Sequence, residues 1–375
     1  MKSNSKTLGD IIQAVDERNS DEKTDEVLGI SINKEFMPSV ANIIGTDLSK
    51  YKLLRKSRFA FNSMHTGRDE RLPIALFKRN DIAIVSPAYF MFEIKNKNEV
   101  DEDYLMIWFQ RPEFDHICWY MTDASVRGGL SWDDFCRITI ELPSIEEQRK
   151  IVHDYKVITD RIELLKKINE NLENEMFSMF KDMLLENDDF SEFESLNKNI
   201  DFVNGLAMQD FRPIDGEKSF PVLKIRELSQ GYCDEKSERC TTELDVSHVI
   251  NKRDLVLSWS GTVQVSFWTD EIAGLNQHLF KVFSNSYPKW LCYLWTKHHI
   301  AEFQRIAANK GTTFGHIVKD DLTNAKIKRI SPKEISMLNC IFNPMMDSIL
   351  NYQSELHLLR KIAHSILSKL SKEVA

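Results

Sequence analysis

The sequence contains no segment that is long and apolar enough to span a membrane, and no complete catalytic motif. No run approaches the ~18 consecutive apolar residues of a transmembrane helix, and the first ten residues, MKSNSKTLGD, lack the apolar region of a signal peptide. There is no phosphate-binding loop, no nucleophile elbow and no helix with two metal-binding histidines. These absences favour a soluble, cytoplasmic protein without a catalytic site of its own.

Cysteine is scarce, and its spacing does not suit a metal. The six cysteines are scattered, and no second pair or histidine cluster joins the closest two, Cys233 and Cys240, in a zinc site. We therefore expect buried free thiols in a reducing compartment. We also expect no metal and no cofactor in this chain.

Basic residues are fewer than acidic ones over the whole chain, but they outnumber acidic ones in two segments. The formal net charge is −8, which by itself argues against nucleic-acid binding. Nevertheless, residues 50–79 hold nine basic against two acidic residues, and residues 281–329 hold nine against three. Two basic segments separated by acidic ones are typical of two DNA contacts, although solvated surface charge would explain either segment alone.

The central stretch, residues 142–185, predicts one long exposed helix. Pro143 and Ser144 precede acidic residues in the first turn, where the helix dipole favours them. Apolar residues then alternate in steps of four and three, which is a coiled-coil seam. Its core positions are Ile151, Tyr155, Ile158, Ile162, Leu165, Leu172, Met176, Met179 and Met183. Asn169 takes one core position, where a polar residue costs stability but fixes register.

The C-terminal stretch predicts a partner helix with the same period. From Ile335 the seam runs through Leu338 to Leu370, and Ser331 and Pro332 begin it much as Ser144 begins the first helix. Pro344 lies inside this seam and lacks a backbone donor, so we expect a kink or a break there. The two helices would pair as an antiparallel coiled coil.

The remaining sequence predicts two related globular units. In residues 1–141, short apolar runs at 27–31, 59–61, 74–77, 82–85 and 89–94 indicate strands, followed by a helix from Tyr104 and a glycine loop at 126–130. In residues 189–330, segments 222–226, 251–258, 279–283, 290–295, 310–317 and 319–322 follow in the same order. We therefore predict an α+β protein of four parts: 1–141, 142–188, 189–330 and 331–375.

Catalytic chemistry is weakly represented. Asp81, Glu93 and Lys95 approach the acid and acid–x–lysine arrangement of Mg²⁺-dependent nucleases. The corresponding strand of the second unit has Lys281, so these side chains are also explained as surface positions. The alternative of a magnesium-dependent nuclease remains open at this point.

Binding chemistry is better represented, because both units combine cations with side chains that can hydrogen-bond base edges. The candidates in the first unit are Lys50, Lys52, Arg55, Arg58, Asn62, His65, Arg68 and Arg127. Those in the second unit are Arg226, Lys252, Arg253, Asn276, Gln277, His278, Lys310, Thr312 and Thr313. Structural roles in turns would also explain many of these candidate residues. A coiled-coil interaction protein with no DNA role is a further alternative.

The pattern resembles the specificity (S) subunit of type I restriction–modification systems over the whole chain. The residues that carry the resemblance are Leu142-Pro-Ser-Ile-Glu-Glu-Gln-Arg-Lys-Ile151 with its helix, segments 47–62 and 84–92, and Leu275-Asn-Gln-His-Leu279. The start of the second helix departs from the pattern, because Ser331-Pro-Lys-Glu-Ile335 lacks the Glu-Gln pair.

The resemblance implies two pseudo-symmetric target recognition domains, each reading one half of a bipartite double-stranded DNA site. The paired helices would set the spacer and dock two methyltransferase (M) subunits, and restriction (R) subunits would join for cleavage. S-adenosylmethionine, ATP and Mg²⁺ would then belong to these partner subunits. The DNA sequence and the spacer length do not follow from the resemblance.

Overall fold

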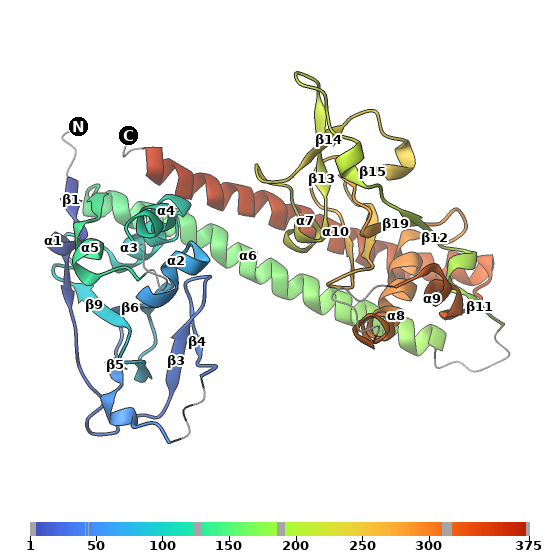
Figure 1. Ribbon diagram of the computed structural model, residues 1–375. Helices are drawn as coiled ribbons and strands as arrows, with labels where there is room; N and C mark the ends of the chain where they lie inside the picture. The colour runs from blue at the N-terminus through green and yellow to red at the C-terminus, as the bar shows by residue number, and fades with distance from the viewer. Residues whose placement is uncertain are drawn as a thin grey trace. The chain divides into compact units, whose positions relative to one another are not determined.

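The chain folds as an α+β protein with two long helices (Figure 1). The computed structural model describes residues 5–122 except 42 and 44, then 129–185, 192–309 and 317–372. It divides into two compact units, Met1–Asp160 with Lys361–Ala375, and Arg161–Arg360. Each long helix therefore contributes to both units, and the four-part division made from the sequence stays a prediction.

Unit 1 has three sheets in its described residues, with strand orders β1-β10, β2-β9-β6-β7 and β4-β3-β8-β5. The strands are β1 (Ser5–Thr7), β2 (Ile12–Ala14), β3 (Val27–Ile30), β4 (Phe36–Pro38), β5 (Lys52–Leu54), β6 (Arg58–Phe61), β7 (Ile74–Phe77), β8 (Ala83–Val85), β9 (Phe90–Ile94) and β10 (Thr139–Glu141). The short helices are α1 (Leu8–Ile11), α2 (Thr66–Asp69), α3 (Glu102–Phe109), α4 (Pro112–Tyr120) and α5 (Trp132–Arg137). All five strands expected from the apolar runs are confirmed, as is the helix around Tyr104.

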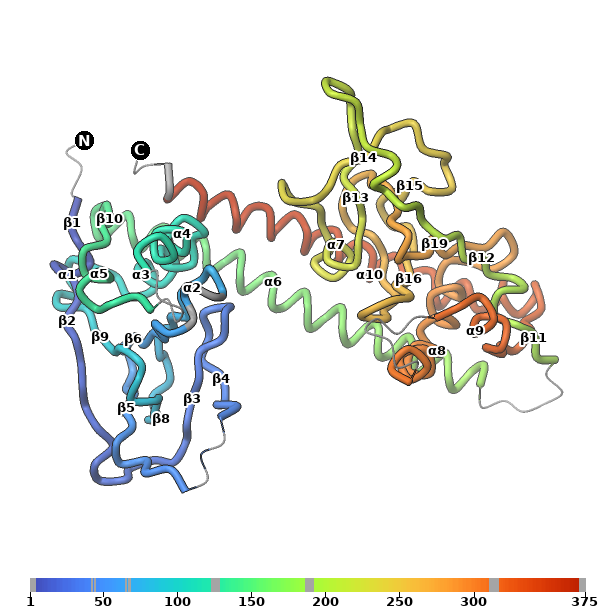
Figure 2. The backbone as a smooth tube through the Cα atoms, viewed as in Figure 1, coloured from blue at the N-terminus to red at the C-terminus, as the bar shows by residue number. Residues whose placement is uncertain are grey.

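Unit 2 has sheets with orders β11-β20, β12-β19-β16-β17 and β14-β13-β18-β15 in its described part. The strands are β11 (Phe193–Ser195), β12 (Asp201–Asn204), β13 (Ser219–Leu223), β14 (Arg239–Thr241), β15 (Val249–Ile250), β16 (Leu255–Ser258), β17 (Gln264–Phe267), β18 (Ala273–Leu275), β19 (Leu279–Phe283) and β20 (Lys326–Lys328). The helices are α7 (Ile225–Gln230), α8 (Lys289–Asn309) and α9 (Lys319–Asn324). Figure 2 shows β13 and β14 running side by side, and the two strands pair antiparallel although α7 lies between them in the chain.

The predicted repeat is confirmed strand by strand. Each sheet of unit 2 reproduces a sheet of unit 1 with every strand number raised by ten. The pairing also agrees in direction, since β3 runs parallel to β8 and β13 runs parallel to β18, while the other named pairs are antiparallel. Two sequences with few identical residues therefore encode the same topology.

Each unit has its own apolar core. In unit 1, Phe59, Phe61 and Phe92 pack against α3 and α5, with Phe59 and Phe92 stacked at a centroid distance of 4.9 Å. In unit 2, Leu255 and Leu257 on β16 pack against buried tryptophans of α8. The alternation of side chains along β6 and β16 places every second residue in these cores.

The central helix, α6 (Ile145–Phe180), continues as a π-helical turn over Lys181–Leu185. Ile162, Leu165 and Met176 are buried, and Asn169 is buried among them at 8% exposure, as the seam predicts. The seam ends before Met183, which is exposed. At its start, the fully buried Gln148 accepts from Asp101 N at 2.9 Å and donates to the carbonyl oxygens of Glu99 and Pro143, each at 2.9 Å.

The C-terminal helix, α10 (Pro332–Lys372), begins at the residue expected from the sequence. It runs through Pro344 without interruption, so of the expected kink or break, the break does not occur. Pro344 is exposed, while Phe342, Met346 and Ile349 on the other face are buried in the core of unit 2. Burial of the residues on both sides of the proline holds the helix together.

The two helices pair with opposite directions within unit 2. Arg161 Nε donates to Glu355 Oε1 at 2.8 Å, whereas further along α6 the side chains of Met176 and Phe180 share a core with Phe342 and Met346. In unit 1, Ile151 and Tyr155 near the start of α6 pack in one core with Leu370 near the end of α10. The antiparallel pairing expected from the two seams is therefore present.

The cysteines only partly follow the expectation of buried thiols. Cys118, Cys240 and Cys292 are buried and Cys136 and Cys233 are half-buried, but Cys340 is exposed on α10. All six are free. The prediction for Cys340 fails because residue 340 lies outside the seam of α10, on the face that the cores leave uncovered.

Candidate nucleic-acid interface

Two of the predicted DNA-contacting arginines in unit 1 share one carboxylate. Arg55 Nη2 lies 2.7 Å from Glu17 Oε1, and Arg58 Nη1 lies 2.7 Å from Glu17 Oε2. The hydrogen bonds from Arg55 and then Arg58 lower the pKa of Glu17 to about 2. Arg58 also donates to the carbonyl oxygen of Leu53 at 2.9 Å. Much of the positive charge of this pair is therefore neutralised within the unit.

The neighbouring lysines differ in availability. Lys52 Nζ donates to the carbonyl oxygen of Tyr89 at 2.8 Å and lies 3.3 Å from Asp16 Oδ1, with only 11% of its side chain exposed. Lys50 is exposed at the end of a short helical turn and pairs with Asp47 at 3.3 Å. Of the two, Lys50 is the better phosphate partner, since exposed ion pairs are weak and easily exchanged.

Three of the remaining unit 1 candidates follow β6 in the sequence. Asn62 caps the next helical turn, because its Oδ1 accepts from Met64 N at 3.1 Å. His65 and Arg68 lie in the short turns Ser63–His65 and Thr66–Asp69, and their side chains are outside the described part. Arg127 lies outside the described residues altogether.

In unit 2, the guanidinium of Arg226 is hydrogen-bonded to nearby carboxylates of the same unit. Its guanidinium makes two hydrogen bonds to Asp234, at 2.9 and 3.0 Å, and two to Glu227, at 2.6 and 3.0 Å. These carboxylates raise the pKa of Arg226, and Glu227 is 2% exposed. The geometry indicates a structural clamp on the segment after α7.

Lys252 and Arg253 are adjacent but not equivalent. Lys252 is exposed and has no ion-pair partner among the described residues. Arg253 has a backbone φ of +70° and donates from Nη2 to Asn351 Oδ1 of α10 at 2.7 Å. Lys252 is thus free to neutralise a phosphate, whereas Arg253 joins its turn to α10.

The candidates Asn276, Gln277 and His278 form the turn between β18 and β19. Asn276 is buried, and its Oδ1 accepts from His278 N at 3.2 Å. His278 is exposed, with Nδ1 3.1 Å from Ser260 Oγ. The close approach of Gly205 supports this turn, because a Cβ there would lie 2.2 Å from the backbone oxygen of Asn276.

Trp259, which the sequence analysis did not single out, organises this region. Its indole Nε1 donates to Asn204 Oδ1 at 3.1 Å and to the carbonyl oxygen of Gln277 at 3.0 Å. Its ring lies 5.7 Å from the ring of His278. Its backbone oxygen accepts from Ile317 N at 2.9 Å, directly after the segment with Lys310, Thr312 and Thr313, which lies outside the described residues.

The residues of the nuclease alternative are engaged separately. Asp81 accepts from Arg79 Nε at 2.9 Å, Glu93 accepts from Gln13 Nε2 at 2.7 Å, and Lys95 donates to the carbonyl oxygen of Gly9 at 2.6 Å. Within the described ranges, no group of three or more His, Cys, Asp or Glu side chains is arranged to hold a metal ion.

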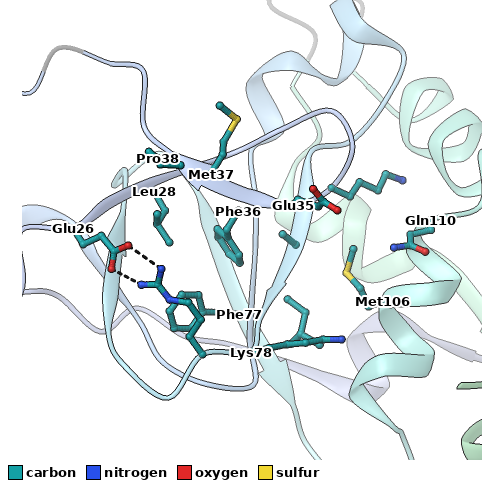
Figure 3. A pocket seen from close by; sticks show the side chains of 14 residues that line it. Glu26, Leu28, Glu35, Phe36, Met37, Pro38, Phe77, Lys78, Met106 and Gln110 are labelled. Carbon is teal, nitrogen blue, oxygen red and sulfur yellow. Dashed lines mark hydrogen bonds and ion pairs between the residues drawn. The ribbon is translucent and has the colours of Figure 1, made fainter. Parts of the chain in front are cut away.

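A cavity of about 450 Å³ in unit 1 is lined by the β3–β4 hairpin, β7 and α3 (Figure 3). The Glu26–Arg79 ion pair lies at one side, while Phe36, Phe77 and Met106 supply apolar walls (Figure 3). Lys34 also lines it, but its ammonium pairs with buried Asp115 at 2.8 Å. Acidic and basic groups are mixed around this cavity, so it does not suit a phosphate.

Comparison with known proteins gives a family match for the first part of the chain. Residues 3–174 match the type I restriction modification DNA specificity domain. Over 301 residues, covering 73% of this chain and 69% of the relative, the sequence is 24% identical to the type I restriction enzyme MjaIX specificity subunit of Methanocaldococcus jannaschii. Residues 3–174, just under half of the chain, therefore match this specificity-domain family. The match indicates a role in DNA recognition.

The fold of the chain agrees with this match. It is similar to the crystal structure of a type I restriction–modification S subunit from M. genitalium, with a TM-score of 0.58, 13% sequence identity, and coverage of 98% of this chain and 96% of that chain. In the part of the chain that the structure describes, no helix is both long and apolar enough to cross a membrane.

The chain has fewer available cations than its sequence indicates. Within residues 50–79, carboxylates from outside the segment pair with Arg55, Arg58, Lys78 and Arg79, and among the described residues only Arg71 and Lys56 lack a carboxylate partner. In the second basic segment, Lys281, Lys297 and Arg329 pair with Asp254, Glu173 and Glu192. Charge counted along the chain misses such partners.

Proposed function

We propose that each unit of this specificity subunit reads one half of a bipartite site in double-stranded DNA. The observation that carries the proposal is the repeated topology, in which three sheets recur with the same strand order and direction. A chain with two copies of one DNA-specificity fold is suited to two DNA contacts, since repeated binding modules match repeated half-sites.

The two units would read different sequences, because their corresponding surface turns differ. The turn after β8 is Ser86-Pro87-Ala88, and the turn after β18 is Asn276-Gln277-His278. Base edges are distinguished by hydrogen-bond donors and acceptors, which the second turn has and the tip of the first lacks. The proposed site is therefore asymmetric.

We further propose that α6 and α10 set the number of base pairs between the half-sites and provide docking faces for two methyltransferase subunits. Both helices contribute to both units, and α6 carries exposed charged residues at Glu146, Glu147, Arg149, Lys150 and Lys156. Methyl transfer and cleavage would belong to the methyltransferase and restriction subunits. S-adenosylmethionine, ATP and Mg²⁺ would act there, and the chain itself would be non-catalytic and cytoplasmic.

The charge pattern supports binding that depends on the partner subunits. The net charge is −8, and most described cations of the basic segments already have carboxylate or carbonyl partners. DNA affinity rises with the number of phosphates neutralised and falls with salt accordingly. The chain alone would thus bind DNA weakly.

The test measures DNA binding by the purified chain, with and without its methyltransferase subunits, across a range of salt concentrations. The expected result is weak, salt-sensitive binding by the chain and tight, sequence-specific binding by the complex. A complex without salt-sensitive DNA binding would support an interaction protein with no DNA role. Magnesium-dependent nicking by the isolated chain would support the nuclease alternative.

A further inference from the structure

The turn between β18 and β19 presents one exposed imidazole in a fixed orientation. His278 is exposed, its Nδ1 lies 3.1 Å from Ser260 Oγ, and its ring lies 5.7 Å from the ring of Trp259. Ser260 is itself buried. No other hydrogen bond of the His278 ring occurs among the described residues, so Nε2 is left available.

Trp259 fixes the backbone of the same turn. The indole N–H is shared between Asn204 Oδ1 and the carbonyl oxygen of Gln277, at 3.1 and 3.0 Å. The same indole therefore links the end of β12 to the turn before β19. A side chain held through both its backbone and its ring loses little conformational freedom when it binds, which favours recognition.

Unit 1 has the same turn with different chemistry. Val85 and Leu275 hold the same place in the parallel pairs β3–β8 and β13–β18, so Ser86 corresponds to Asn276 and Ala88 to His278. The backbones agree, because Tyr89 N donates to Ser86 O and Leu279 N donates to Asn276 O, each at 3.0 Å.

The capping bond of the turn is also common to both units. Ala88 N donates to Ser86 Oγ at 3.3 Å, as His278 N donates to Asn276 Oδ1 at 3.2 Å. The buried Asn276 side chain therefore stabilises the turn and does not contact a base. What distinguishes the two units is the exposed tip, Pro87-Ala88 against Gln277-His278.

The support behind the tip differs as well. Phe61 pairs with Phe90 as Leu257 pairs with Phe280, so Ser63, two residues beyond Phe61, corresponds to Trp259. A serine at this position has no ring to place against another and is too short to bond both acceptors of the indole. Unit 1 thus lacks both the imidazole and the side chain that holds it.

We infer that His278 is a specificity-determining residue that reads a base edge through Nε2, and that Trp259 is the positioning residue that aims it. The inference rests on the proposed function of the two units. An imidazole can offer N–H to guanine O6 or N7, or a lone pair to an exocyclic amino group, according to which nitrogen carries the proton. The corresponding turn of unit 1 makes no such contact.

The experiment uses the full chain in complex with its methyltransferase subunits and selects bound sequences from a library of random duplex DNA. His278→Phe keeps an aromatic ring against Trp259 but removes both nitrogens. Trp259→Phe keeps a ring but removes the indole donor. Ala88→Gly, at the equivalent position of unit 1, is the matched control.

The variants at positions 278 and 259 should change the sequence preference in one half-site only. His278→Phe should abolish the preference at one base position in one half-site, with a loss of roughly tenfold in discrimination there. Trp259→Phe should weaken preference at that same position, and the other half-site should be unchanged in both variants. Ala88→Gly should leave both half-sites unchanged. Thermal unfolding midpoints close to that of the wild type would confirm that these variants fold.

The inference is overturned if His278→Phe selects the same sequences as the wild-type chain. It is also overturned if both half-sites lose preference equally, because that pattern indicates a general loss of binding. Should Trp259→Phe fail to fold, His278→Ala and His278→Phe still decide the matter, since residue 278 is exposed. If the wild-type complex itself selects no sequence, the proposed function fails before this inference is reached.

Discussion

The replacement Asn169→Leu should stabilise the protein. Asn169 occupies a core position of the α6 seam at 8% exposure. Its Nδ2 donates to Glu173 Oε1 at 3.1 Å, but its buried Oδ1 has no hydrogen-bond partner within the part of the chain that the structure describes. A buried acceptor without a donor costs about 1–3 kcal/mol, and burying leucine contributes about 1.5–3 kcal/mol.

The losses in this variant are smaller than the gains. The hydrogen bond to the Glu173 carboxylate is worth about 1.5–3 kcal/mol, but Glu173 keeps other donors, from Tyr293 and Lys297, at 2.9 and 3.1 Å. The net expectation is a gain of about 2 kcal/mol in the free energy of unfolding of unit 2. For a unit of this size, that gain raises the unfolding midpoint by roughly 4–8 °C.

Calorimetric unfolding of the full chain measures this effect, with Asn174→Leu as the control at an exposed position of the same helix. The control should change stability by no more than about 0.5 kcal/mol. An Asn169→Leu variant that unfolds at a lower temperature than the wild type would refute the reasoning. It would mean that the buried amide contributes more through its polar contacts than leucine gains by burial.

Three further perturbations test other parts of the account. Gln148→Ala should destabilise unit 1 by about 3 kcal/mol or more in denaturant unfolding, because it leaves one backbone donor and two carbonyl oxygens of a fully buried site unpaired. A loss below about 1 kcal/mol, the value of one ordinary hydrogen bond, would contradict this expectation. Glu17→Gln should lower the free energy of unfolding by about 1 kcal/mol at pH 7. This difference from the wild type should fade as the pH drops from about 4.5 towards 2, because a carboxylate with a lowered pKa stabilises the fold only while it is ionised. A difference independent of pH would argue against the Arg55 and Arg58 pairs. Gly205→Ala should lower the unfolding midpoint of unit 2, because the new Cβ would lie 2.2 Å from Asn276 O, and an unchanged midpoint would show that this turn can move.

Periodicity and order along the chain predicted the framework of the fold. The alternation of apolar residues located both seams, including the polar position at Asn169, and the shared order of short segments located the repeat. These features are local or repetitive, so the sequence carries them directly. The break expected at Pro344 did not occur, because tertiary burial around Phe342 and Met346 outweighs one missing backbone donor.

The candidate interface was less accessible from sequence, because it depends on contacts between distant residues. Glu17 lies 38 residues before Arg55, so a count over residues 50–79 could not include it. Trp259 carries no motif, and its role comes from Asn204 and Gln277, which meet it only in the folded sheet. The one sequence signal was an aromatic residue two positions before Gly261, in a segment that is otherwise small and polar.

The central claim is that this chain gives a restriction–modification complex a two-part DNA site, one part for each unit. The most direct test is to map methylated adenines across the genome of cells that express this chain together with its methyltransferase. The account predicts a single motif of two short defined sequences, different from each other, separated by a gap of constant length. Methylation with no motif that depends on the chain, or a motif that is one uninterrupted sequence, would contradict it.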